Sequence, residues 1–189
     1  MAEVRVSISK EGKPLEAVCQ SADHYLLAEE AVNIVMKTEF TPGKSGDERI
    51  QALTTVKIPF IYQSSYFTSK SNFDHTADFA GFARPKKENK IIHCKVQELD
   101  EPLKIVVPPK PTMVRDEEGI VQTGSATIEG LIDTEGRFCM LSVVKSDNKH
   151  VTAAALESFE SVEFAPPTKN GARATTRIRL PYNATTHDK

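Results

Sequence analysis

The sequence predicts an α+β fold made of two β-β-α-β units, each a small antiparallel sheet covered by one helix, with an ordered insertion between them. Two observations predict this fold. The chain repeats itself at an offset of 124 residues, and each copy places strand-like alternation before apolar residues at helical spacing. The expected boundaries are 1–62 for the first unit, 63–98 for an aromatic-rich insertion containing strands, and 99–189 for the second unit with a proline-rich lead.

The repeat is visible in residues that share one offset. Gly12 stands 28 residues before Phe40, and Gly136 stands 28 residues before Phe164. With a shift of two residues, the strand-like stretch 56–60 also matches 178–182. The offset of 124 pairs the following residues: Ile8 with Ile132, Glu11 with Glu135, Asp23 with Asp147, Ala31 with Ala155, and Glu39 with Glu163.

Each unit is expected to open with a β-hairpin. Val4, Val6 and Ile8 alternate with polar residues, as in a strand with one buried face, and Glu11-Gly12 supplies a turn into a second strand over 15–19. The second copy repeats this pattern with strands over 128–133 and 138–144 around Glu135-Gly136.

A helix is expected after each hairpin, with its apolar stripe packed on the strands. Asp23 is the expected N-cap of the first helix, and Pro42 and Pro166 end the two helical regions. The expected stripes are Leu27, Ala31, Ile34 and Val35 in the first copy and Val151, Ala155, Leu156 and Phe159 in the second.

A last strand closes each unit. Its expected inward residues are Thr54, Val56 and Ile58 in the first copy and Ala174, Thr176, Ile178 and Leu180 in the second. In the second copy, Arg173, Arg177 and Arg179 occupy the opposite face. Two interpretations stay open. The charges protect a sheet edge against aggregation, or the edge accepts a peptide strand that the arginines select for acidic or carbonyl-rich character.

Composition excludes several classes of function. The chain has 189 residues with 24 Lys and Arg against 26 Asp and Glu, a net charge of −2, so no charge excess favours nucleic acid or an anionic membrane. No run approaches the roughly 18 apolar residues of a membrane helix, which predicts a soluble chain. Three cysteines without C-x-x-C spacing are expected to be buried free thiols, neither a disulfide framework nor a zinc site.

The sequence also lacks the motifs of catalysis, so we expect no enzyme, no cofactor and no metal. Gly43-Lys44-Ser45 is not a phosphate-binding loop because Thr38 stands where that loop requires glycine. The cluster Asp74-His75-Thr76-Ala77-Asp78 is interpreted as a solvated turn. Lys86-Lys87 is too short a basic cluster to indicate nucleic-acid binding.

Taken together, these features resemble the C-terminal domain of the TonB family of energy-transducing proteins. The second copy carries most of the resemblance, and the first copy keeps Glu11-Gly12, Phe40-Thr41-Pro42, Gly46 and Ile58-Pro59-Phe60. The similar features of the second copy are Val107-Pro108-Pro109-Lys110-Pro111, Ile132-Asp133-Thr134-Glu135-Gly136, Ala154-Ala155-Leu156, Phe164-Ala165-Pro166-Pro167, Asn170-Gly171 and Leu180-Pro181-Tyr182.

The resemblance implies a periplasmic protein-interaction module linked to energy-dependent transport. Such a module binds a peptide segment of an outer-membrane transporter by adding it as a strand to its own sheet, with no bond chemistry. The residues that the resemblance marks for peptide binding are Arg173, Thr175, Arg177 and Arg179 of the last strand, with Asn170 and Gly171 setting its start.

The chain also departs from the TonB pattern. A TonB protein needs an inner-membrane helix and a long periplasmic spacer, and this sequence contains neither. A second hypothesis therefore stands beside the first. In it, the chain is a structural scaffold or dimerisation protein whose copies pair through their sheet edges, with each other or across a dimer, and bind no receptor peptide.

Overall fold

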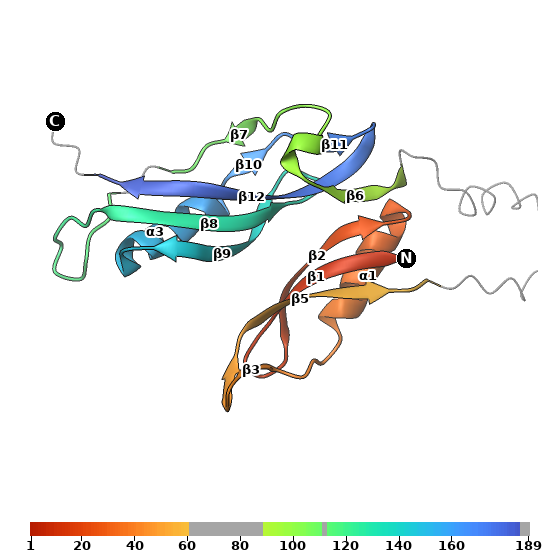
Figure 1. Ribbon diagram of the computed structural model, residues 1–189, viewed down its shortest axis with the longest axis horizontal. Coiled ribbons are helices and arrows are strands. Elements are labelled where there is room, and N and C mark those ends of the chain that lie inside the picture. Colours follow the sequence, from red (N-terminus) through yellow and green to blue (C-terminus); the bar gives the residue numbers. More distant parts are fainter. Residues whose placement is uncertain (61–88, 111–112, 186–189) are drawn as a thin grey trace, which may run out of the picture. The chain divides into compact units, whose positions relative to one another are not determined.

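The computed structural model describes residues 1–60, 89–110 and 113–185, and it is a mixed α+β protein (Figure 1). The chain divides into two compact units. Unit 1 comprises Met1–Ile92 and Asn170–Arg173, and unit 2 comprises His93–Lys169 and Ala174–Lys189. Much of the predicted insertion, including its five aromatic residues and the two clusters Asp74-His75-Thr76-Ala77-Asp78 and Lys86-Lys87, lies outside the described residues.

Unit 1 contains a three-stranded antiparallel sheet in the order β5-β1-β2. Its β1 pairs with β2 on one side and with all seven residues of β5 on the other. The elements, in chain order, are β1 (Ala2–Ile8), β2 (Pro14–Ala22), α1 (Tyr25–Met36), the short hairpin β3 (Gly43–Ser45) and β4 (Glu48–Ile50), and β5 (Ala52–Ile58).

The core of unit 1 lies between this sheet and α1. The even-numbered residues of β1 all point into it, since Val4 and Val6 have no exposed surface. The buried members are Ala2, Val4, Val6, Ile8, Cys19, Ala22, Ala28, Ala31, Val35 and Ile91. Burying this apolar set is the main force that holds hairpin and helix together.

Unit 2 has its own antiparallel strands in the order β12-β8-β9. Its N-terminal part carries the last residues of β6 (Ile91–Cys94), a strand inside the predicted insertion, and the 3₁₀ helix η3 (Val96–Glu98). The remaining elements are β7 (Ile105–Val107), β8 (Gly124–Ile132), β9 (Phe138–Ser146), α3 (Lys149–Glu160), β10 (Glu163–Phe164), which pairs with β7, β11 (Thr168–Lys169) and β12 (Ala172–Ala184).

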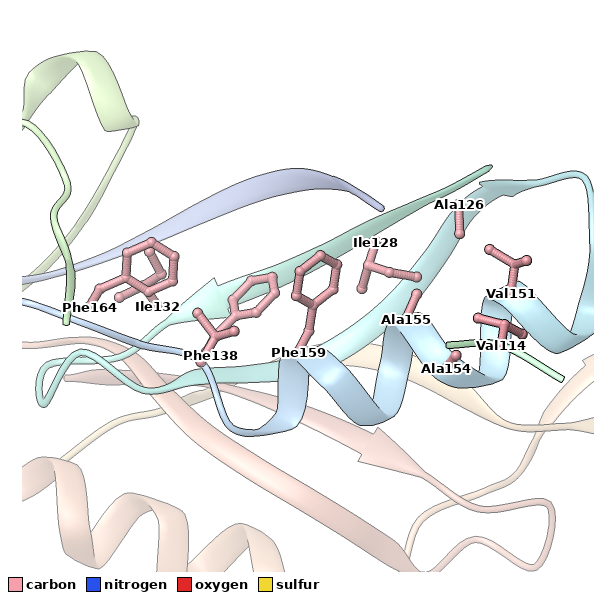
Figure 2. Close-up of a cluster of buried hydrophobic side chains, with 11 residues drawn as sticks. Val114, Ala126, Ile128, Ile132, Phe138, Val151, Ala154, Ala155, Phe159 and Phe164 are labelled. Atoms are coloured by element: carbon pink, nitrogen blue, oxygen red, sulfur yellow. The ribbon is translucent and has the colours of Figure 1, made fainter. Parts of the chain in front are cut away.

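The core of unit 2 is built around three phenylalanines (Figure 2). The ring of Phe138 meets Phe159 and Phe164 edge to face, each at 6.1 Å between ring centroids. Aromatic pairs in this arrangement add to the free energy gained from burial alone. The other buried members are Val114, Ala126, Ile128, Ile132, Val151, Ala154, Ala155 and Val162.

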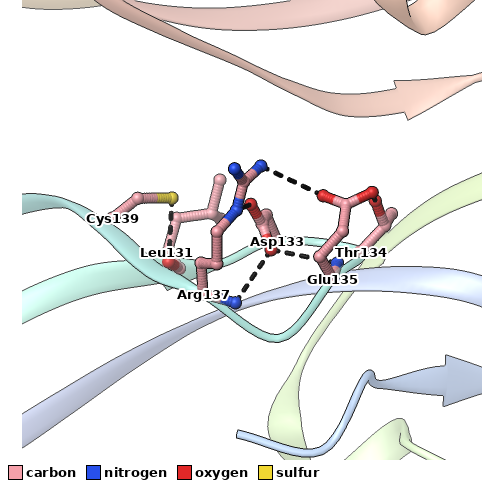
Figure 3. Close-up of polar contacts among 6 residues, drawn as sticks. All are labelled: Leu131, Asp133, Thr134, Glu135, Arg137 and Cys139. Atoms are coloured by element: carbon pink, nitrogen blue, oxygen red, sulfur yellow. Dashed lines mark hydrogen bonds and ion pairs between the residues drawn. The ribbon is translucent and has the colours of Figure 1, made fainter. Parts of the chain in front are cut away.

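The predicted turn at Glu135-Gly136 is held by Asp133, whose side chain is buried (Figure 3). Its Oδ1 accepts hydrogen bonds from the backbone N–H groups of Glu135 at 3.0 Å and Arg137 at 2.9 Å, and its Oδ2 accepts one from Arg137 Nε at 2.7 Å. Gly136 takes a φ of +89°, which glycine adopts without steric cost. The Asp133 carboxylate therefore fixes both ends of the turn.

Four details differ from the sequence-based expectations. Cys139 is only partly buried, whereas all three cysteines are expected to be buried. The N-cap of α1 is His24, not Asp23, because His24 Nδ1 accepts the hydrogen bond from the Leu26 N–H at 3.2 Å. Ile34 does not face the core of unit 1, since 41% of it is exposed. Thr54 is also exposed, and it lies on β5 at the edge of the sheet.

Candidate peptide-binding edge

The longest strand, β12, is only partly covered by other strands. It has 13 residues, and β8 lies beside nine of them, from Thr176 to Ala184. Its other strand neighbours are β6, with four residues, and β11, with two. The hydroxyl groups of Thr175 and Thr176 contact His93 and Cys94 of β6, which has only four residues. Among the described strands, β8 alone therefore lies beside residues 179–184. We call the opposite side of residues 177–183 the β12 edge.

The backbone groups that face the β12 edge can be identified from β8. The carbonyl oxygen of Glu129 accepts a hydrogen bond from Ser142 Oγ, on the neighbouring strand β9, so Glu129 directs its backbone groups toward β9. In an antiparallel strand the backbone groups of successive residues point to alternate sides. Gly130 therefore bonds toward β12, and its register partner Ile178 bonds toward β8.

The same alternation turns the backbone N–H and C=O of Arg177 and Arg179 away from β8 and toward the β12 edge. Pro181 fits this assignment. It has no N–H, and in a sheet proline is tolerated where the N–H would point outward from the ladder. In the open part of this edge, from residue 179 onward, the backbone donors and acceptors that a new strand could meet are thus those of Arg179 and Asn183, with the carbonyl of Pro181.

The side chains of the two arginines share one carboxylate. Arg179 Nε donates to Glu129 Oε2 at 2.8 Å, and Arg177 Nη1 lies 3.9 Å from Glu129 Oε1. Both arginine side chains remain substantially exposed, at 43% for Arg177 and 64% for Arg179. Two positive charges on one negative charge leave a net charge of +1 beside the β12 edge, which favours an acidic residue in any strand that binds there.

Thr175 differs from the arginines because its side chain is fully buried. Its Oγ1 lies 2.9 Å from His93 Nδ1, and the neighbouring Thr176 Oγ1 donates to the Cys94 carbonyl at 2.8 Å. The resemblance marks Thr175 for peptide binding, and the structure places its side chain against β6.

Arg173, Asn170 and Gly171 lie at the start of β12. Arg173 stacks over the Tyr25 ring, with its guanidinium carbon 4.9 Å from the ring centroid. Asn170 and Gly171 both have positive φ, at +53° and +75°, which is the geometry of a tight two-residue hairpin turn between β11 and β12. These three residues shape the beginning of the strand and lie apart from the β12 edge as defined.

A tether on β11 stabilises this hairpin. Lys169 Nζ, in β11, donates to Glu98 Oε1 at 2.8 Å. This hydrogen bond raises the pKa of Lys169 and lowers the pKa of Glu98, so both groups stay charged over a wide range of pH. The pair joins η3 to the strand that leads into β12.

Glu129 is the functional candidate that the sequence analysis missed. It occupies β8, and only the register of β12 on β8 brings its carboxylate to the two arginines. The one signal in the sequence was a single acidic residue in an otherwise apolar or neutral strand. Within the described ranges, no group of three or more His, Cys, Asp or Glu side chains is arranged to hold a metal ion. Nor does any described helix combine the length and the apolar character needed to cross a membrane.

In comparisons with known proteins, no protein-family model, no curated protein and no solved structure matches the chain.

Proposed function

We propose that the chain is a TonB-like protein-interaction module that binds an extended peptide segment by strand addition at the β12 edge. The observation that carries the proposal is that β12 has 13 residues, of which residues 179–184 have a strand on one side only within the described part of the chain. A sheet edge of this kind offers backbone hydrogen bonds to an incoming strand. The proposed partner is a segment of an outer-membrane transporter, and the proposed location is the periplasm.

The proposal includes a fold of two β-β-α-β copies. In support, β2 and β9 begin at residues 14 and 138, and α1 and α3 begin at 25 and 149, so both pairs are 124 residues apart. The N-caps His24 and Asn148 also differ by 124.

Turn contacts support the same correspondence. The Phe40 N–H donates to the Gly12 carbonyl at 2.9 Å, and the Phe164 N–H donates to the Gly136 carbonyl at 2.8 Å. In both hairpins the glycine carbonyl accepts a hydrogen bond from a residue 28 positions downstream. Duplicated units are expected to share such a contact.

The competing hypothesis is a structural scaffold or dimerisation protein. In it, the backbone groups of the β12 edge are already hydrogen-bonded to another protein strand, and no receptor peptide binds. The Arg179–Glu129 pair is compatible with either function, since an ion pair on an edge strand also discourages unwanted pairing. The two hypotheses differ in whether the outward amides of β12 respond to peptide.

The test is a titration of the ¹⁵N-labelled chain with peptides from the N-terminal segments of outer-membrane transporters encoded in the same genome. We expect amide shifts concentrated at 177–183. Arg179→Pro should weaken binding about tenfold or more, because it removes an outward donor and adds bulk, while the β8 ladder stays intact. Arg179→Ala is the matched control, since it keeps the backbone donor and should weaken only peptides that contain acidic residues. Saturating peptide that leaves these amides unmoved would reject receptor coupling.

A further inference from the structure

The two helices differ on one flank. Ala154 and Ser158 of α3 are buried, at 8% and 2% exposure. The residues 124 positions earlier in α1 are Glu30, which is exposed, and Ile34, which is 41% exposed. An aliphatic side chain is thus more open to solvent in α1 than the polar serine at the corresponding position of α3.

The flank of α3 is buried because the lead segment of unit 2 lies on it. Ser158 Oγ donates to the Lys110 carbonyl at 2.9 Å. Further along, Val114 is 5% exposed and joins the core beside Val151 and Ala154 (Figure 2). A stretch of chain that precedes β8 therefore completes the packing of α3.

The corresponding flank of α1 consists of Leu27, Glu30 and Ile34, and we call it the α1 flank. These residues lie three and four positions apart, so they share one side of the helix. Leu27 is half-buried, and the neighbouring Leu26 adds a side chain that is 49% exposed. No described segment covers this side in the way that Lys110 and Val114 cover α3.

Charge indicates what the α1 flank would accept. Glu30 replaces Ala154, which places a carboxylate between Leu27 and Ile34. Among the described residues Glu30 forms no ion pair. A segment that buried Leu27 and Ile34 would also cover Glu30, and covering an unpaired carboxylate is costly unless the segment brings a cation.

We propose that the α1 flank binds an extended segment of another protein that carries apolar side chains and a lysine or arginine opposite Glu30. The lead segment of unit 2 has this chemistry, with Lys104 and Lys110 among apolar and proline residues. The proposal rests on the correspondence between the two copies and is independent of strand addition at the β12 edge, because the two sites use different residues and different contacts.

The test uses a synthetic peptide with the sequence of residues 103–114 and the ¹⁵N-labelled full chain. We expect amide shifts over α1 and not over β12. Ile34→Asp should weaken binding about tenfold, because it removes an apolar contact worth roughly 1.4 kcal/mol or more. Ile120→Asp, at a position that is 57% exposed in unit 2, is the matched control and should bind as the unmodified chain does.

A charge swap distinguishes specific binding at the α1 flank from non-specific hydrophobic binding. Glu30→Lys should weaken the peptide, and replacing both peptide lysines by glutamate should restore binding to that variant. Three results would overturn the proposal. The first is the absence of amide shifts in α1 at about 1 mM peptide, a concentration that would reveal a Kd as weak as about 1 mM. The second is amide shifts confined to α3. The third is a dimer in sedimentation that Ile34→Asp dissociates, which would make the α1 flank an interface between copies of this chain.

Discussion

Gly136→Ala tests the close backbone contact between the hairpin turn of unit 2 and Phe164, which follows α3. Gly136 has a φ of +89°, and a Cβ built there would stand 2.0 Å from the carbonyl oxygen of Phe164. Backbone cannot move out of the way as a flexible side chain would, so the residues around Phe164 must shift. That shift strains the hydrogen bond from the Phe164 N–H to the Gly136 carbonyl, which measures 2.8 Å.

Two costs make up the expected loss. A left-handed conformation costs alanine about 1–2 kcal/mol. Weakening one backbone hydrogen bond adds about 0.5–1.5 kcal/mol. Gly171→Ala is the matched control, because Gly171 also has positive φ, at +75°, but nothing lies within 4 Å of its Cβ position. Gly171→Ala should therefore lose only the free energy that the left-handed conformation costs alanine.

The assay is urea denaturation followed by circular dichroism, with methyl or amide NMR signals reporting each unit. We expect Gly136→Ala to lower the free energy of unfolding by about 2–3 kcal/mol, clearly more than Gly171→Ala. Gly12→Ala should act in the same way on unit 1, since its Cβ would stand 2.1 Å from the Phe40 carbonyl oxygen. A Gly136→Ala loss no larger than that of Gly171→Ala would refute the reasoning.

Two further predictions concern titrating groups. Hydrogen bonds from the Ser125 N–H and hydroxyl lower the pKa of Asp147 below its ordinary 3.8, so the stabilisation that the Asp147 carboxylate gives is present above pH 3.8 and is lost as pH falls through the lower pKa. Asp147→Asn should therefore lower the melting temperature near neutral pH, and the difference from the unmodified chain should shrink below pH 3.8. A difference that stays constant with pH would contradict this. Burial raises the pKa of Cys19 to about 11, so it should be alkylated far more slowly than the less buried Cys139 when labelling is followed by mass spectrometry, and equal rates would contradict the buried environment.

Local sequence signals predicted the elements that depend on local chemistry. The hairpin pattern predicts a turn at Glu135-Gly136, and the structure has it there, with Gly136 at positive φ and Asp133 as the hydrogen-bond acceptor. The helix over residues 25–36 follows from its apolar spacing. The cap was misplaced by one residue, because His24 offers a ring nitrogen where the sequence suggested a carboxylate.

Features that depend on distant segments could not be predicted. Ile34 belongs to the helical stripe by spacing, but whether that side of the helix is covered depends on another stretch of chain. Thr175 reads as an outward residue beside Arg173 and Arg177, yet His93 and β6 bury it. Glu129 reaches the arginines only through the register of β8 on β12, which sequence alternation alone does not fix.

Hydrogen exchange of the β12 amides, without any ligand, tests the central claim most directly. If the β12 edge is open, the amides of Arg179 and Asn183 exchange rapidly, while Ile178 and Leu180, bonded to β8, exchange slowly, giving an alternation along one strand. Added transporter peptide should then slow Arg179 and Asn183 alone. Slow exchange at all four positions before any peptide is added would show that the edge is already paired, which contradicts strand addition and favours the scaffold.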